Sequence, residues 1–264
     1  MAWNICDLEK IVRGAGIMLR DASVGDNDVM SKSGDANFAT VYDVKIQRFL
    51  IAELRRLVPD ASFFGEEDTD GNEQNRLSDG YTFIIDPIDG TTNFMFGYQH
   101  SCVSVGVAYE GKLVAGCIYN PYVDAMYLAE KGRGCWCNGR RLVMEDKPVS
   151  EGIIAFGCAR YNESNVDLLF DVVKELFHSA LSIRSGGSAA LDLARIAAGS
   201  NVAYLELRLN PYDFAAAAIM IQEAGGTVVR MDGSPVTLDA PCSILAGTPA
   251  AVEEILDLIR LKRQ

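Results

Sequence analysis

The spacing pattern of the hydrophobic residues changes a little past the middle of the chain, near residue 150. Between residues 62 and 137, short runs of β-forming residues follow one another, and Glu110-Gly111 and Asn138-Gly139 fall between such runs. Glycine tolerates positive φ in a two-residue connection, so these dipeptides predict hairpins and an antiparallel sheet. After residue 150, strand-like and helical runs alternate, which is typical of an α/β arrangement. We therefore predict an α+β half over residues 1–149 and an α/β half over 150–264, joined in one compact unit.

Apolar residues at helical spacing predict two amphipathic helices near the N-terminus, over residues 3–20 and 43–57, the second of which stops at Pro59. In the first half, the predicted strands cover residues 62–64, 81–85, 101–109, 112–119, 125–130 and 134–137. In the second half, the predicted strands cover 153–156, 181–183, 202–206, 227–229 and 243–246, and the helices 165–178, 188–198, 212–224 and 249–261. The two halves are expected to share a cleft, because ligands usually bind at such junctions.

The charge balance excludes several classes of partner. The chain has 24 Lys and Arg against 36 Asp and Glu, a net charge of −12, so it repels nucleic acid and anionic membranes. No apolar run reaches the roughly 20 residues that span a membrane, and no basic-then-apolar leader opens the sequence. The seven cysteines are scattered without a C-x-x-C pair, which is typical of reduced thiols. We expect a cytoplasmic protein that binds neither nucleic acid nor membrane.

The most informative stretch combines two aspartates with small hydroxyl residues, and it reads Ile84-Ile85-Asp86-Pro87-Ile88-Asp89-Gly90-Thr91-Thr92-Asn93-Phe94. An apolar strand leads to Asp86, Pro87 is expected to end that strand, and Asp89 follows three residues after Asp86. Carboxylates on such a strand-to-turn elbow, beside exposed backbone N–H groups, suit hard cations and a phosphate together. The alternative is an Asp-Pro turn followed by a helix N-cap, which uses the same residue types.

Two further acidic positions lie at predicted element ends. Glu66 and Glu67 follow the short strand at 62–64, while the nearby Asp68 and Asp70 are better explained as a solvated charge run. An EF-hand loop that begins at Glu66 is excluded, because Leu77 stands where the bidentate Glu is required. Asp213 begins an Ala-rich helix, where it suits a helix N-cap and a metal ligand equally well.

Taken together and in order, these segments resemble the three signatures of the inositol monophosphatase family. They are Gly65-Glu66-Glu67, the segment 86–94, and Tyr212-Asp213-Phe214-Ala215-Ala216. The resemblance extends from Lys32 to about Gly226. It implies a layered αβαβα sandwich of the inositol monophosphatase and fructose-1,6-bisphosphatase type, and Mg²⁺-dependent hydrolysis of a phosphate monoester with two or three ions.

Carried over residue by residue, the resemblance makes the metal ligands Glu66, Asp86, Asp89, Asp213 and the carbonyl of Ile88. Glu66 and the Thr91 hydroxyl, the latter oriented by Asp43, would position and deprotonate the attacking water. The phosphate would meet the backbone of Gly90 and Thr91. The remaining substrate contacts are implied at Asp89, Gly187, Ser188, Ala189, Glu206 and Asp213.

The sequence departs from the family pattern in two places. Asn37 stands where the loop before Asp43 usually carries an aspartate, and a neutral ligand would weaken a metal held by this loop. Tyr212 replaces the usual Trp of the helix signature and keeps an aromatic wall. The resemblance also implies sensitivity to lithium and a homodimer, for which the apolar hairpins at residues 101–119 are a candidate interface.

Other functions are less consistent with the sequence. A Cys-x₅-Arg match runs from Cys135 to Arg141, but its Asn138-Gly139 turn places the cysteine on a strand rather than in a phosphate cradle. No P-loop motif is present, and neither His100 nor His178 has the setting of a nucleophile. A catalytically silent sugar-phosphate-binding protein on the same fold remains an alternative. Among substrates, inositol-1-phosphate is favoured, with fructose 1,6-bisphosphate, histidinol phosphate and nucleotide phosphates left open.

Overall fold

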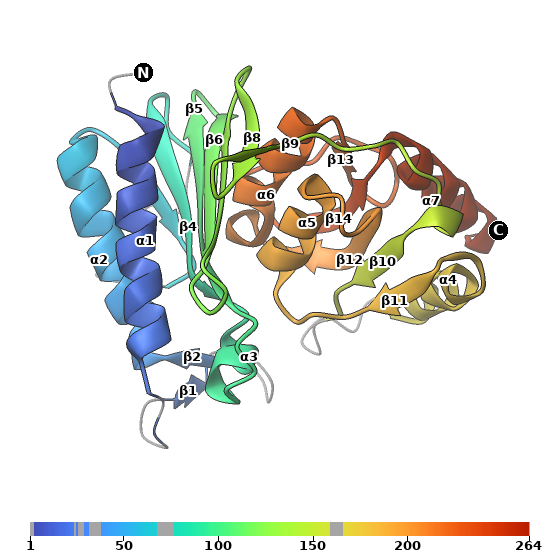
Figure 1. Ribbon diagram of the computed structural model, residues 1–264, viewed down its shortest axis with the longest axis horizontal. Coiled ribbons are helices and arrows are strands. Elements are labelled where there is room, and N and C mark those ends of the chain that lie inside the picture. Colours follow the sequence, from blue (N-terminus) through green and yellow to red (C-terminus); the bar gives the residue numbers. More distant parts are fainter. Residues whose placement is uncertain are drawn as a thin grey trace.

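The computed structural model describes residues 3–23, 25, 29–31, 38–67, 77–158 and 166–263. It has five layers, which Figure 1 shows from left to right. Helices α1 (Ile5–Asp21) and α2 (Val41–Leu57) cover a seven-stranded sheet, and α5 (Ala189–Ala197) and α6 (Pro211–Ala224) separate it from a five-stranded sheet. Helices α4 (Val166–Ser179) and α7 (Pro249–Lys262) form the last layer. The predicted αβαβα sandwich is confirmed.

The seven-stranded sheet is a meander in chain order, from β3 to β9. Its strands are β3 (Ser62–Gly65), β4 (Tyr81–Asp89), β5 (Cys102–Tyr109), β6 (Lys112–Asn120), β7 (Ala125–Glu130), β8 (Gly134–Cys137) and β9 (Arg140–Leu142). Only the β3–β4 pair is parallel. Both predicted hairpin turns are present, since Glu110, Gly111, Asn138 and Gly139 all have positive φ. Cys135 therefore lies on a strand, as predicted.

The five-stranded sheet is mixed, with the strand order β11-β10-β12-β14-β13. Its strands are β10 (Ile153–Phe156), β11 (Ser182–Arg184), β12 (Ala203–Leu209), β13 (Thr227–Val229) and β14 (Cys242–Gly247). β10 pairs in parallel with β11 and β12, and β14 pairs antiparallel with β12 and β13. The predicted alternation of strands and helices is thus present, but it produces a sheet that is only partly parallel.

Three local features differ from the sequence prediction. β4 does not end at Pro87 but continues to Asp89, because a register shift between Asp86 and Asp89 accommodates the missing N–H of proline. A short antiparallel pair, β1 (Val29–Ser31) with β2 (Phe38–Thr40), and the edge strand β9 were not predicted. These strands have three residues each, too few to show an alternation of apolar and polar positions.

The start of α2 carries a reciprocal cap. The Thr40 side chain accepts a hydrogen bond from the backbone N–H of Tyr42, and the Asp43 carboxylate accepts from the backbone N–H of Thr40 at 2.7 Å. This pair satisfies N–H groups that a helix N-terminus leaves without partners. The short α3 (Thr91–Met95) begins after Gly90, which has a left-handed φ of +87°. A one-turn 3-10 helix, η2 (Val149–Glu151), precedes β10.

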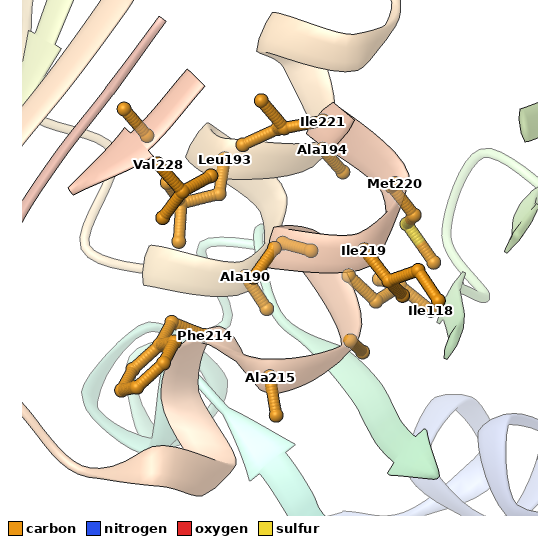
Figure 2. Close-up of a cluster of buried hydrophobic side chains, with 14 of the residues drawn as sticks. Ile118, Ala190, Leu193, Ala194, Phe214, Ala215, Ile219, Met220, Ile221 and Val228 are labelled. Carbon is orange, nitrogen blue, oxygen red and sulfur yellow. The ribbon is translucent and has the colours of Figure 1, made fainter. Parts of the chain in front are cut away.

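The core between the sheets is formed by α6, whose Ala-rich sequence is buried almost all round. Figure 2 shows Phe214, Ala215 and Ile219 of α6 in this cluster, with Ala190 of α5 and Ile118 of β6. The close approach of α6 requires two glycines that pair across β5 and β6, Gly106 and Gly116. A Cβ on Gly106 would lie 2.8 Å from the Cβ of Ala215. The glycine pair therefore fixes where the helix carrying Asp213 lies against the sheet.

The β5–β6 hairpin does not offer its faces to a second copy of the chain. Nearly all of β5 and most of β6 are buried, and their alternating side chains belong to the two clusters on either side of the sheet. The expectation that residues 101–119 supply a dimer interface is therefore wrong for these faces. Among the described residues, no helix is long and apolar enough to cross a membrane.

The packing of α6 predicts the effect of adding one methyl group at Gly116. A Cβ there would lie 2.5 Å from the carbonyl oxygen of Ala216 and 2.9 Å from the Ile219 side chain. We expect Gly116→Ala to lower the free energy of unfolding, measured by urea denaturation, by about 1–3 kcal/mol, because α6 must shift. Gly80→Ala is the control, since the nearest atom that its Cβ would meet is the Ser78 hydroxyl oxygen, 4.0 Å away. Equal stability of the Gly116 variant and the wild type would contradict this account of the packing.

Candidate active site

Three of the predicted ligands lie together where β4 ends and α6 begins. Carboxylate oxygens of Asp86, Asp89 and Asp213 lie within 4.8 Å of one another. Asp86 and Asp89 are held on either side of the register shift in β4. Asp213 is the third residue of α6, where its carboxylate accepts from the backbone N–H of Asn210 at 2.6 Å. The N-cap of this helix is therefore Asn210, three residues before the position predicted from the sequence.

Glu66 reaches the same cluster from the adjacent strand. β3 runs parallel to β4, and the N–H of Glu66 donates to the carbonyl of Ile85 at 3.1 Å, just past the end of β3. A hydrogen bond with Glu66 and its negative charge both raise the pKa of Asp86. The structure thus brings together all four carboxylates that the family resemblance assigned to metal.

Burial dominates the electrostatics of this cluster. Loss of water raises the pKa of Asp86 and of Asp213 well above the ordinary range, and the charge of Glu66 adds to both shifts. The pKa of Asp89 rises to about 6 for the same reason, although hydrogen bonds from Ser188 and from the Ala190 N–H oppose the shift. The charged groups that most affect these three residues are themselves carboxylates. Such a site favours a bound cation.

The donor set suits a hard divalent cation. It consists of carboxylate oxygens and, at Ile88, a carbonyl on the same elbow, without sulfur or imidazole among the assigned ligands. Mg²⁺ prefers oxygen ligands of this kind and retains part of its water shell. The buried and mutually repelling carboxylates of this structure therefore fit the metal that the resemblance implied.

Beside the cluster, Thr91 connects the elbow to α2. Its hydroxyl lies 3.0 Å from the Ile88 carbonyl oxygen and 3.2 Å from Oδ1 of Asp43, so it can donate its single proton to one of them. The other oxygen of Asp43, Oδ2, accepts from both the N–H and the hydroxyl of Thr40. Asp43 is fully buried and is held in place by this cap. The predicted pairing of Thr91 with Asp43 is present in the structure.

The predicted substrate side is partly occupied by contacts within the protein. The Ser188 hydroxyl donates to Oδ2 of Asp89, and the N–H of Ala190 donates to the same oxygen at 3.0 Å. Ser188 is also the N-cap of α5. The Ser188 hydroxyl is therefore already hydrogen-bonded to Asp89 in this structure. Gly187 and Ala189 flank Ser188 in the same turn.

Glu206 lies on β12 and is buried, with a hydrogen bond from the Tyr204 hydroxyl. The pKa of Glu206 is raised to about 7, chiefly by burial; the hydrogen bond from Tyr204 opposes this shift, and the charges of Asp89 and Asp192 add to it. Glu206 also contributes to the raised pKa of Asp213. It is thus electrostatically linked to the carboxylate cluster.

Sequence reasoning missed several residues that position the site. The Asn93 amide donates to the carbonyls of His100 and Gly186, at 2.8 and 2.9 Å, and so ties the elbow to the turn before α5. The side-chain amide of Gln47 accepts a hydrogen bond from the backbone N–H of Glu67 at 3.0 Å and donates one to the backbone carbonyl of Glu67 at 2.6 Å. Asn93 belongs to the quoted motif, but its two partners lie 7 and 93 residues away, so only the fold identifies its role.

Some sequence predictions fall outside the described residues. They concern the segment 32–37, which includes Asn37, and the charge run at Asp68 and Asp70. Tyr212 is described, and its ring contacts that of Phe64 with centroids 6.3 Å apart, which agrees with an aromatic wall at the start of α6.

Comparison with known proteins gives one consistent result. The model of the "Inositol monophosphatase family" matches residues 5–263. Inositol monophosphatase 1 of Bos taurus is 34% identical over 264 residues, covering 98% of this chain and 95% of that protein. Inositol-1-monophosphatase of Bacillus subtilis is 32% identical over 250 residues, covering 94% and 93%. The crystal structure of extragenic suppressor protein suhB from Bartonella henselae superposes with a TM-score of 0.87 at 29% identity, covering 97% of each chain.

The raised pKa values predict how the metal-free protein responds to pH. The pKa of Asp89 is 3.8 in its reference state and about 6 in the fold, so between these values the folded state binds more protons than the unfolded one. Stability is therefore lost as the pH rises through this window, because the folded state must then hold an ionised carboxylate in a buried site among other carboxylates. We expect the Tm in EDTA to fall between about pH 4 and pH 6, and Mg²⁺ to restore more stability at the higher pH.

The variant Asp89→Asn isolates this contribution, because an amide does not titrate in this range. Its Tm in EDTA should depend less steeply on pH than that of the wild type. An unchanged slope in the variant would contradict the assignment of the raised pKa to this buried cluster.

Proposed function

The chain belongs to the inositol monophosphatase family, whose members are phosphomonoesterase hydrolases, and we propose that it hydrolyses inositol-1-phosphate to inositol and phosphate with Mg²⁺. The observation that carries the proposal is the buried cluster of Asp86, Asp89 and Asp213 beside the Thr91–Asp43 pair. A site with several carboxylates and a held hydroxyl has the parts needed to bind cations and orient a water molecule.

We assign the metal to Glu66, Asp86, Asp89, Asp213 and the carbonyl of Ile88, with two or three ions bound. Mg²⁺ held by these residues would neutralise the phosphate, lower the pKa of water and stabilise the departing oxygen. Glu66 and the Thr91 hydroxyl position the attacking water. When the Thr91 proton is donated to Asp43, the lone pairs of that hydroxyl are left to accept a hydrogen bond from the water. Glu66 then takes the water's proton.

The substrate meets the elbow on one side and β12 on the other. Backbone of Gly90 and Thr91 binds the phosphate, and Asp89, Asp213, Glu206 and the turn of Gly187, Ser188 and Ala189 face the alcohol. Glu206 accepts a hydrogen bond from a ring hydroxyl when it is ionised. Because its pKa is about 7, this contact is only partly available at neutral pH in the metal-free protein. The same chemistry on a sugar bisphosphate, histidinol phosphate or a nucleotide phosphate is the nearest alternative.

The assembly and location of the enzyme follow the family. We propose a homodimer with lithium-sensitive activity, whose contact surface lies away from the buried faces of β5 and β6. We also propose a cytoplasmic location, which is supported by the seven free thiols.

Replacement of one ligand tests the metal assignment. Asp89→Asn keeps the size and the acceptor for Ser188 but removes a charge, so we expect kcat to fall by about a thousandfold or more. The Tm in EDTA should not fall, because the lost charge is a repelling one. Asp257→Asn, on the exposed face of α7 beside Arg260, is the matched control and should retain full activity. A kcat close to wild type in the Asp89 variant would rule out this scheme.

A substrate panel tests the proposed specificity. Phosphate release should require Mg²⁺, should stop in EDTA, and should give the highest kcat/KM with inositol-1-phosphate. The comparison substrates are fructose 1,6-bisphosphate, histidinol phosphate and 3′-phosphoadenosine 5′-phosphate. A higher kcat/KM with one of these would move the assignment to that substrate. No release from any of them, despite Mg²⁺-dependent stabilisation of the protein, would instead indicate the catalytically silent binding protein.

A further inference from the structure

Ser104 on β5 is a buried hydroxyl residue that the proposed function leaves without a role. It is fully buried, and within the described part of the chain its Oγ has no hydrogen-bond partner. A buried hydroxyl normally donates at least one hydrogen bond, and leaving it unpaired is unfavourable.

The register of the sheet places Ser104 against that centre. Ser104 is the direct cross-strand partner of Asp86, so the two side chains project from the same face of the sheet. This is the face that α6 covers, because Ile84, Cys102 and Ala108, which alternate with the same parity, belong to the cluster around α6.

The neighbours of Ser104 along β5 define its position further. Two residues before it, the Cys102 sulfur lies 3.8 Å from Oδ2 of Asp89. Two residues after it, Gly106 lies under Ala215, the second residue after Asp213. Ser104 is therefore flanked by contacts to Asp89 and to the start of α6, and it faces Asp86 across the strands.

We propose that Ser104 is a positioning residue of the divalent-cation centre, whose hydroxyl donates a hydrogen bond to an oxygen of that centre. Because Oγ of Ser104 makes no hydrogen bond to a carboxylate of the described residues, this oxygen would be one of the waters that Mg²⁺ retains. This inference rests on the proposed function, since it requires a cation at Asp86, Asp89 and Asp213. Partners of this kind orient metal ligands, and their loss lowers metal affinity about tenfold or more.

The proposal predicts opposite effects of Ser104→Ala with and without metal. In EDTA the variant should be at least as stable as the wild type, because the substitution removes an unpaired buried hydroxyl. In Mg²⁺ it should bind the ion about tenfold more weakly, measured from the dependence of Tm on Mg²⁺ concentration and repeated with Mn²⁺. Neither readout depends on turnover.

Thr82→Val is the matched control, because Thr82 is a buried hydroxyl on β4 whose Oγ1 accepts from the N–H of Ser78 at 3.1 Å. It should lose stability in EDTA and keep the wild-type affinity for Mg²⁺. Ser104→Cys, which retains a weak donor of similar size, should bind Mg²⁺ with an affinity between those of Ser104→Ala and the wild type.

Three results would overturn the proposal. They are an unchanged Mg²⁺ affinity in Ser104→Ala, a loss of stability or of folding in EDTA for that variant, and an affinity of Ser104→Cys below that of Ser104→Ala. If the wild type itself gains no stability from Mg²⁺ or Mn²⁺, the proposed function fails as well. If the wild type gains stability and Ser104→Ala gains as much, only the role of Ser104 fails.

Discussion

Asp86 and Asp89 are buried and Asp213 is half-buried, and the fold holds their carboxylate oxygens within 4.8 Å of one another although like charges repel. Loss of water is the largest cause of the raised pKa values of all three residues, and repulsion from neighbouring carboxylates adds to it. The arrangement persists because each carboxylate is attached to an element that cannot move alone. β4 is buried along nearly its whole length, and α6 is enclosed between the two sheets. The metal-free site is therefore an unfavourable arrangement that the surrounding core maintains and a cation relieves.

Helix caps provide much of this positioning. Asp43 and Asp213 each occupy the third position of a capping box, in which their carboxylates accept from the backbone N–H of Thr40 and Asn210. Ser188 caps α5 and also donates to Asp89. A residue that completes a helix terminus has its rotamer fixed by the backbone, so the site residues need little further support. Capping and metal binding are therefore compatible roles of the same aspartates, rather than competing explanations.

Local sequence signals predicted most strand and helix ranges, whereas the layers and the carboxylates that lie together were implied by the family resemblance. Periodicity identified α1 and the buried β4, and the turn dipeptides identified the hairpins, because these signals are local. The continuation of β4 through Pro87 and the roles of Asn93 and Ser104 were not accessible. The course of β4 depends on a register shift, Ser104 meets Asp86 through strand pairing, and Asn93 contacts carbonyls 7 and 93 residues away. All three follow from tertiary packing rather than from local preference.

The charge of the whole chain and the charge of the site act in opposite directions on a phosphate substrate. A net charge of −12 repels a phosphate dianion over most of the surface, and the metal-free cluster repels it most strongly at the site itself. Two or three divalent ions would add +4 to +6 beside Asp86, Asp89 and Asp213 and reverse the local sign. The phosphate is then attracted only where the divalent ions are bound. Substrate binding and catalysis therefore both require that the ions bind first. An acidic chain can in this way select a phosphate without a basic patch.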